Sequence, residues 1–123
     1  LRDFREVIFH ELVHIFQYDI IYQKPFARIY SGEFLYSAPI WFIEGAADYL
    51  ANDVDAVGEM VLRDACLNDQ IPSLTDLENF YILGPQVYLG YKIGQSAVGY
   101  LVDNYGREKI GELMHPNYSL SLK

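Results

Sequence analysis

The stretch VIFHELVHIFQ, residues 7–17, places His10 and His14 four positions apart with Glu11 between them. Apart from Gln17, its other residues are all apolar. Apolar side chains recur at spacings of three and four over residues 2–22, without Gly or Pro, which predicts one helix there. In a helix, residues four apart share a face and lie about 6 Å apart along the axis.

The three polar residues spell H-E-x-x-H. Two imidazoles on one helical face can converge on a zinc ion at about 2.0–2.1 Å each. Glu11 is turned about 100° away from that face, beside the metal, where it can take a proton from a water molecule. The alternative is a chance match, with both histidines as ordinary core or surface residues. Apolar neighbours (Val7, Ile8, Phe9, Leu12, Val13, Ile15 and Phe16) argue against it, because we expect them to pack around His and Glu side chains that then need partners.

A catalytic zinc site needs a third protein ligand from elsewhere in the chain. Residues 41–50, WFIEGAADYL, carry Glu44 and Asp48 on one face of a second predicted helix. One carboxylate can bind the metal while the other accepts the remaining N–H of a ligand histidine. Gly45 would let this helix approach the first closely. A solvated acidic face is the competing interpretation, and His115, beside Pro116, is the competing third ligand.

The rest of the chain predicts a mainly α protein. Further helices are expected at about 39–52, 54–67, 86–105 and 107–114, with a loop over 24–39 that could hold a short strand pair. Thr75 and Glu78 fit a capping box, and Gly106 fits a C-cap.

Length and composition favour one domain. The chain has 123 residues and a net charge of −8, which argues against a nucleic-acid surface. No apolar run approaches the 18 or so residues of a membrane span. The lone Cys66 excludes an internal disulfide, and we expect it to be buried as a small hydrophobic residue. Because the chain starts with Leu1 rather than Met, we interpret residues 1–123 as a helical (sub)domain of a larger polypeptide.

HELVH followed by WFIEGAADYL resembles the gluzincin branch of zinc metallopeptidases, and most closely the peptidase MA-like domains of bacterial extracytoplasmic proteins. The resemblance implies the helical half of a thermolysin- or aminopeptidase-like zincin domain, with the H-E-x-x-H helix packed on the E-x-x-x-D helix. It implies one zinc ion bound by His10, His14 and Glu44, with Glu11 as general base. Asp48 would be the hydrogen-bond partner of a ligand histidine. It also implies an extracytoplasmic location.

The family uses a Tyr or His to stabilise the oxyanion, in some members a Tyr in a Y-x-x-G pattern. Here YKIG offers Tyr91 with Gly94, and Tyr88 is the reserve candidate, with core packing an equal alternative for both. The chain departs from the family in two ways. The segment between His14 and Glu44 is longer than in the best-known members, and the sheet edge that binds substrate would lie upstream of residue 1.

The leading hypothesis is therefore zinc-dependent hydrolysis of peptide bonds in a peptide or protein substrate. A second hypothesis is a non-catalytic helical binding or scaffold module that retains a zinc site. A third is a helical bundle without metal, which predicts that Glu44 lies far from both histidines.

Overall fold

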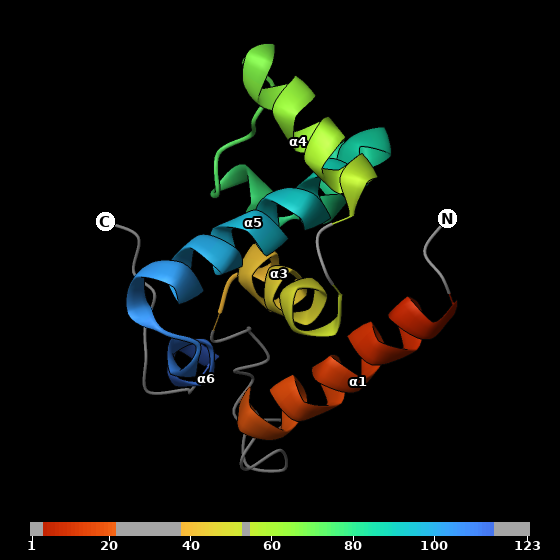
Figure 1. The fold of residues 1–123 in the computed structure, drawn as a ribbon. Helices are drawn as coiled ribbons and strands as arrows, with labels where there is room; N and C mark the ends of the chain where they lie inside the picture. The colour runs from red at the N-terminus through yellow and green to blue at the C-terminus, as the bar shows by residue number, and fades with distance from the viewer. Residues whose placement is uncertain (1–3, 22–37, 53–54, 115–123) are drawn as a thin grey trace.

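The computed structural model describes residues 4–21, 38–52 and 55–114 (Figure 1). Over these ranges the chain is helical and contains no strand, which confirms the mainly α prediction there. The α-helices are α1 (Phe4–Ile21), α3 (Ile40–Ala51), α4 (Ala56–Leu67), α5 (Val87–Tyr105) and α6 (Glu108–Met114), and the 3-10 segments η1 (Asp76–Glu78) and η2 (Phe80–Gln86) precede α5. None of the described helices combines the length and apolarity needed to cross a membrane. The predicted loop and strand pair lie mostly outside the described residues.

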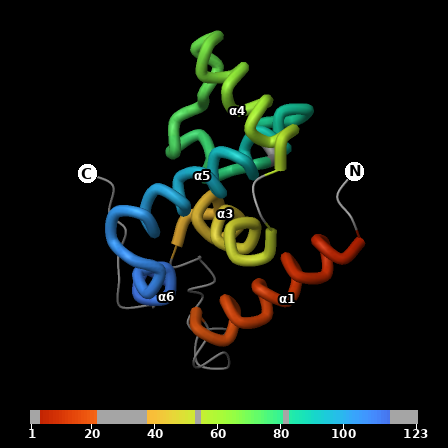
Figure 2. Tube along the Cα trace, in the orientation of Figure 1, coloured from red at the N-terminus to blue at the C-terminus, as the bar shows by residue number. Residues whose placement is uncertain are grey.

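Helix α3 lies at the centre of the molecule, with α5 crossing on one side and α1 on the other (Figure 2). The α3 and α5 backbones touch at Gly45 and Gly94. A Cβ atom on Gly94 would lie 2.6 Å from the carbonyl oxygen of Trp41, and one on Gly45 would collide with the Gly94 backbone. The prediction that Gly45 lets α3 approach the first helix is wrong. Glu44 faces α1, and the next residue is turned about 100° around the helix, toward α5.

The apolar core surrounds α3 and reaches α5 and α6. The side chains of Phe42 and Ala46 are fully inaccessible to solvent, and α3 is buried over most of its length. The same core cluster contains buried residues of the other elements, among them Leu77, Phe80, Leu89, Ile93, Val98, Ile110 and Met114. This core fixes α3, and therefore the side chains that α3 directs toward α1.

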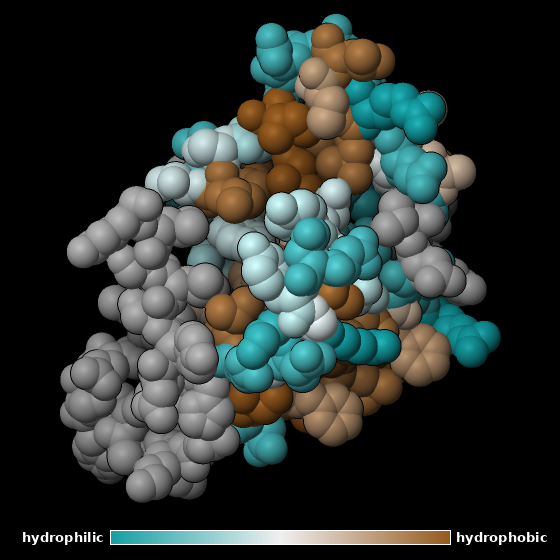
Figure 3. All heavy atoms as spheres, turned by 60° about the vertical axis from the view of Figure 1, so that its left-hand side comes forward, coloured by the Kyte–Doolittle hydropathy of each residue, from teal (hydrophilic) through white to brown (hydrophobic). Residues whose placement is uncertain are grey.

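Helix α1 has its polar residues on the inside. Its buried residues are His10, His14, Gln17 and Ile21. The exposed face carries most of the apolar side chains of α1, namely Phe4, Val7, Ile8, Phe9, Leu12, Ile15 and Phe16. Hydrophobic side chains are visible along the lower edge of the space-filling view, at the height of α1 (Figure 3). A surface helix normally turns its apolar stripe to the core. The prediction that these apolar neighbours pack around the histidines is therefore wrong.

Two local predictions also need correction. The hydrogen bonds of a capping box form at Ser73 and Asp76, not at Thr75 and Glu78: the Asp76 N–H donates to Ser73 Oγ at 3.2 Å and the Ser73 N–H to Asp76 Oδ2 at 3.1 Å. Thr75 makes no side-chain cap. Cys66 is exposed rather than buried. The predicted C-cap at Gly106 is confirmed, with a φ of 93° and an N–H that donates to Val102.

Candidate metal centre

Three potential metal ligands converge between α1 and α3. His10 and His14 lie on the buried face of α1, and Glu44 projects from α3. The two Nε2 atoms are 2.9 Å apart. Glu44 Oε2 lies 3.2 Å from His10 Nε2 and 3.4 Å from His14 Nε2. The third hypothesis of the sequence analysis predicted that Glu44 lies far from both histidines, and these distances contradict that prediction.

The triangle of ligand atoms has the size that one metal ion requires. Ligand atoms about 2.1 Å from a tetrahedral zinc ion are separated from one another by about 3.4 Å. The three observed separations, from 2.9 to 3.4 Å, are close to that value. One ion can therefore contact all three residues at once. Two imidazoles with one carboxylate also leave a fourth tetrahedral position for a non-protein ligand.

The remaining ring nitrogens of both histidines have fixed partners. His10 Nδ1 donates to Asp48 Oδ1 at 2.7 Å, and Asp48 is fully buried. His14 Nδ1 donates to Gln17 Oε1 at 2.6 Å, and Gln17 Nε2 in turn donates to the Ile43 carbonyl at 2.8 Å. A proton held on Nδ1 leaves the Nε2 lone pair free to bind a metal. Both imidazoles are thus oriented toward the same point.

Gln17 is a site residue that the sequence analysis did not assign. It lies three residues after His14, which places it on the same face of α1. That spacing was a usable signal, because a ligand histidine needs a partner for its second nitrogen. Gln17 is 2% exposed and links His14 to the backbone of α3.

The close approach of these groups shifts their pKa values in opposite directions. Burial alone would lower the pKa of His10, but hydrogen bonds to Asp48 and Glu44 outweigh it and raise that pKa to about 9. The pKa of His14 is also raised, chiefly by its contact with Glu44. Burial favours the neutral form of Glu44, yet the two histidines overcome this and lower its pKa to about 2. The cluster therefore stabilises the ionised carboxylate of Glu44 and the protonated forms of His10 and His14.

The accessible side of the cluster is formed by Glu44 and aromatic side chains. A cavity of about 230 Å³ is lined by Glu44, Tyr18 and Tyr91, together with apolar residues of α3, η2 and α5. The Tyr91 ring lies edge-on to His10, with ring centroids 6.1 Å apart. Tyr88, the reserve candidate, instead lies beside Lys92, whose ammonium is 5.5 Å from its ring centroid. Of the two tyrosines, Tyr91 is the one that adjoins the cluster.

Two further candidates of the sequence analysis are not among the three converging ligands that the structure describes. Glu11 is exposed on α1, about 100° around the helix from His10. His115, the rival third ligand, lies outside the described residues. The three ligand atoms found together are those of His10, His14 and Glu44.

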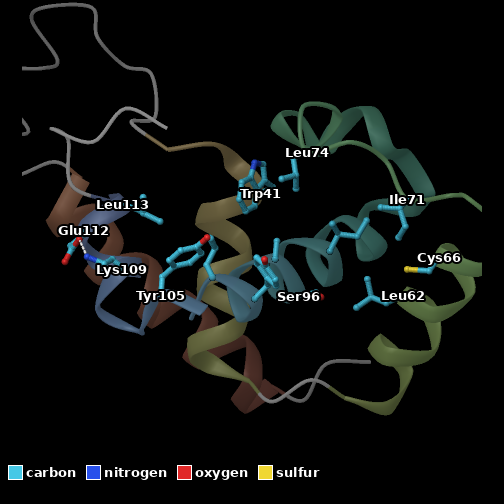
Figure 4. Close-up of a pocket in the computed structure, with 14 residues that line it drawn as sticks. Trp41, Leu62, Cys66, Ile71, Leu74, Ser96, Tyr105, Lys109, Glu112 and Leu113 are labelled. Atoms are coloured by element: carbon cyan, nitrogen blue, oxygen red, sulfur yellow. Dashed lines mark hydrogen bonds and ion pairs between the residues drawn. The ribbon is translucent and has the colours of Figure 1, made fainter. Parts of the chain in front are cut away.

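A larger apolar groove lies away from this cluster. It has a volume of about 780 Å³ and is lined by residues of α3, α4, α5 and α6 and of the segment after α4, none of them among the three candidate ligands. Figure 4 shows Trp41 and Leu74 along one side, Leu62 and Cys66 at one end, and the Lys109–Glu112 ion pair at the other. The candidate metal centre and this groove are therefore separate features of the molecule.

Comparison of the chain with protein-family models, with curated proteins and with solved structures finds no significant match. What stands is a mainly helical domain with a His10, His14 and Glu44 cluster that could hold one metal ion. The zincin fold, the extracytoplasmic location and the further domains of the polypeptide stay predictions drawn from the motif resemblance.

Proposed function

We propose that the protein is a zinc-dependent hydrolase of peptide bonds, of the gluzincin type. The observation that carries this proposal is the triangle of His10 Nε2, His14 Nε2 and Glu44 Oε2, whose sides measure 2.9 to 3.4 Å. Zinc is favoured over magnesium or calcium because two imidazoles suit a borderline-soft ion. The fit of this donor set to a tetrahedral ion supports the choice.

Each side chain has a stated role in this proposal. Zinc, when bound, acts as a Lewis acid toward a carbonyl and lowers the pKa of a water molecule. Glu11 takes the proton of the attacking water and passes it to the leaving amine. Tyr91, beside His10 and in the wall of the cavity that contains Glu44, donates a hydrogen bond to the carbonyl oxygen as negative charge develops there. Asp48 and Gln17 hold the two imidazoles in the ligand tautomer.

The metal is tested by counting zinc ions in protein purified without chelator. We expect about one zinc per chain in the wild type and a large loss in His14→Ala. His115→Ala is the matched control, since it removes the rival histidine and should retain zinc. Less than about half an equivalent in the wild type, or equal zinc in wild type and His14→Ala, would contradict the metal site.

The base is tested by Glu11→Gln in the full-length protein, assayed on a peptide library. Because Glu11 is not among the ligands, the variant should keep its zinc and lose cleavage by a factor of about 100 or more. Glu6→Gln, an exposed acidic residue earlier on α1, is the matched control and should cleave at the wild-type rate. Equal cleavage by Glu11→Gln and wild type would end this assignment. Bound zinc without any cleavage by the wild type would favour the scaffold hypothesis.

A further inference from the structure

Lys92 is a buried lysine that has no role in the proposed hydrolysis. Its side chain is 4% exposed, and it lies on α5 against oxygen atoms from three other residues. Lys92 Nζ donates to Gln95 Oε1 at 3.1 Å and lies 3.5 Å from Asp55 Oδ2 and 3.9 Å from Asp48 Oδ2. A lysine is almost never fully buried unless it is paired. One of these partners, Asp48, is also the hydrogen-bond partner of His10 in the candidate metal centre.

Asp48 connects the two sites through its two oxygens. Oδ1 accepts the hydrogen bond of His10 Nδ1 at 2.7 Å, while Oδ2 faces the Lys92 ammonium. The carboxylate is fully buried, so solvent does not compensate its charge. A buried charge that loses its partner is strongly destabilised, so the group or its neighbours move. Lys92 therefore places a positive charge 3.9 Å from the Asp48 oxygen that does not bind His10.

The surroundings of Lys92 hold its ammonium in this position. Gln95 accepts its hydrogen bond and donates through Nε2 to the carbonyl of Asn52 at 3.1 Å, at the end of α3. The first turn of α4 covers its stem, because a Cβ atom on Gly58 would lie 2.9 Å from Lys92 Cδ. Asp55 is the N-cap of α4 and accepts from the Gly58 N–H at 2.6 Å. Lys92 thus ties the start of α4 to Asp48.

We infer that Lys92 is a positioning residue for the metal centre: it holds the Asp48 carboxylate so that His10 keeps its proton on Nδ1 and turns Nε2 to the metal. The inference rests on the proposed metal site, and it concerns His10 rather than the reaction. Loss of an outer hydrogen-bond partner of a ligand histidine typically lowers metal affinity by about 10- to 100-fold. We expect a loss of that order when Lys92 is removed.

The test compares zinc affinity in Lys92→Met with that in Lys109→Met. The first change keeps an unbranched side chain and deletes the charge. The second deletes a half-exposed lysine whose partner is Glu112, on α6. Zinc affinity, measured by competition with a chromogenic chelator, should fall about 10-fold or more in Lys92→Met and stay at the wild-type value in Lys109→Met. In zinc-free protein at a pH above the His10 pKa of about 9, the nitrogen chemical shifts of the neutral imidazole should show loss of the wild-type tautomer in Lys92→Met and not in Lys109→Met.

A double-mutant cycle with Asp48→Asn makes the test independent of folding losses. If Lys92 acts through the charge of Asp48, Lys92→Met should have no further effect on zinc affinity in the Asp48→Asn background. The double variant buries no unpaired charge and should fold even where Lys92→Met does not. An equal further loss of affinity in that background would overturn the inference. So would wild-type affinity and His10 shifts in Lys92→Met.

These readouts separate the inference from the proposed function. Wild-type protein that binds zinc and cleaves no peptide removes the hydrolase proposal and leaves the Lys92 test intact. Wild-type protein that binds no zinc removes the metal site, and the His10 shifts, measured above the His10 pKa of about 9, then report whether Lys92 positions the imidazole.

Discussion

Helix α3 is held by its two neighbours in different ways. Against α5 it packs by shape, with the backbones in contact where Gly45 meets Gly94 and apolar side chains around them. Against α1 it is held by polar groups. His10 donates a hydrogen bond to Asp48, Gln17 donates one to the Ile43 carbonyl, and the triangle of potential metal ligands lies between the two helices. Most apolar residues of α1 face outward instead.

The difference shows which conditions each contact should depend on. Close packing depends on shape and dispersion and does not respond to pH or to a metal. Buried polar groups depend on every partner being present, because an unpaired buried donor or charge is costly. The α3–α5 contact should therefore survive changes that release α1.

The largest expected effect is on the α3–α5 contact. In Gly45→Ala the added Cβ collides with the Gly94 backbone, which no side-chain rotation can relieve. The free energy of unfolding should fall by about 3 kcal/mol or more. Urea unfolding, with and without zinc, gives the value, and the loss should be similar in both conditions.

Gly111→Ala is the matched control for that substitution. Gly111 lies in α6 with open space around its Cβ position, so Ala there should be neutral or stabilising by up to about 1 kcal/mol. If Gly45→Ala unfolds at the wild-type urea concentration, the helices do not cross as closely as described.

If the proposed zinc ion binds between α1 and α3, its removal should affect the α1–α3 contact. Zinc bound only by the folded protein stabilises it by about 2.7 kcal/mol when free zinc is 100 times Kd. Chelation should lower the melting temperature and increase hydrogen exchange in α1, while α3 and α5 keep their protection. Gly111→Ala protein should respond to chelation as the wild type does. Uniform loss of protection over all helices would mean that the two contacts do not separate.

The sequence predicts much of this arrangement, and its errors have a common cause. The approximate helix bounds follow from spacing, and so does a second helix that offers Glu44 and Asp48 on one face. The choice of Glu44 as the ligand follows from the resemblance to gluzincins. Spacing does not predict which face of α1 turns inward, because two stripes at helical spacing compete. One stripe runs through His10, His14 and Gln17, and the other through Leu12 and Ile15. The choice between them is made by α3, which offers hydrogen-bonding groups that a pattern within α1 cannot report.

Gly45 shows the same limit from the side of α3. A glycine beside a predicted ligand indicates a close approach of two helices, but it does not say which helix approaches. The offset of about 100° between Glu44 and Gly45 decides this once Glu44 is known to face α1. Lys92 and Asp55 come from elements whose placement near Asp48 depends on the whole fold, so their contacts were beyond prediction from spacing.

The pH dependence of stability should depend on the metal. The folded-state pKa of His10 is raised from 6.5 to about 9, and that of Glu44 is lowered from 4.5 to about 2. The raised pKa of His10 stabilises the fold fully below pH 6.5, and this contribution is lost as the pH rises through 9. The lowered pKa of Glu44 stabilises the fold fully above pH 4.5, and this contribution is lost as the pH falls toward 2. Zinc-free protein should therefore be most stable between pH 4.5 and 6.5.

The expected change is on the order of 2 kcal/mol between about pH 6 and pH 9 in urea unfolding of the zinc-free protein. With zinc present the slope should reverse, because the imidazoles must lose their protons to bind the ion. His10→Gln protein should lose most of the zinc-free slope. A zinc-free wild type that is equally stable at both pH values would show that the two pKa shifts do not contribute to holding α1.

The smallest expected effect is on the outer face of α1. Ile15 is 61% exposed, so Ile15→Gln removes little packing and should change the free energy of unfolding by no more than about 0.5 kcal/mol. Ile21, on the inner face of the same helix, is 1% exposed, and Ile21→Gln should cost several times more because it buries an unpaired amide. Urea unfolding of the two variants therefore compares how much each face of α1 contributes to the free energy of unfolding. A loss above about 1 kcal/mol for Ile15→Gln would mean that the outer face is packed in solution, and that α1 is held by its apolar residues as well as by its polar ones.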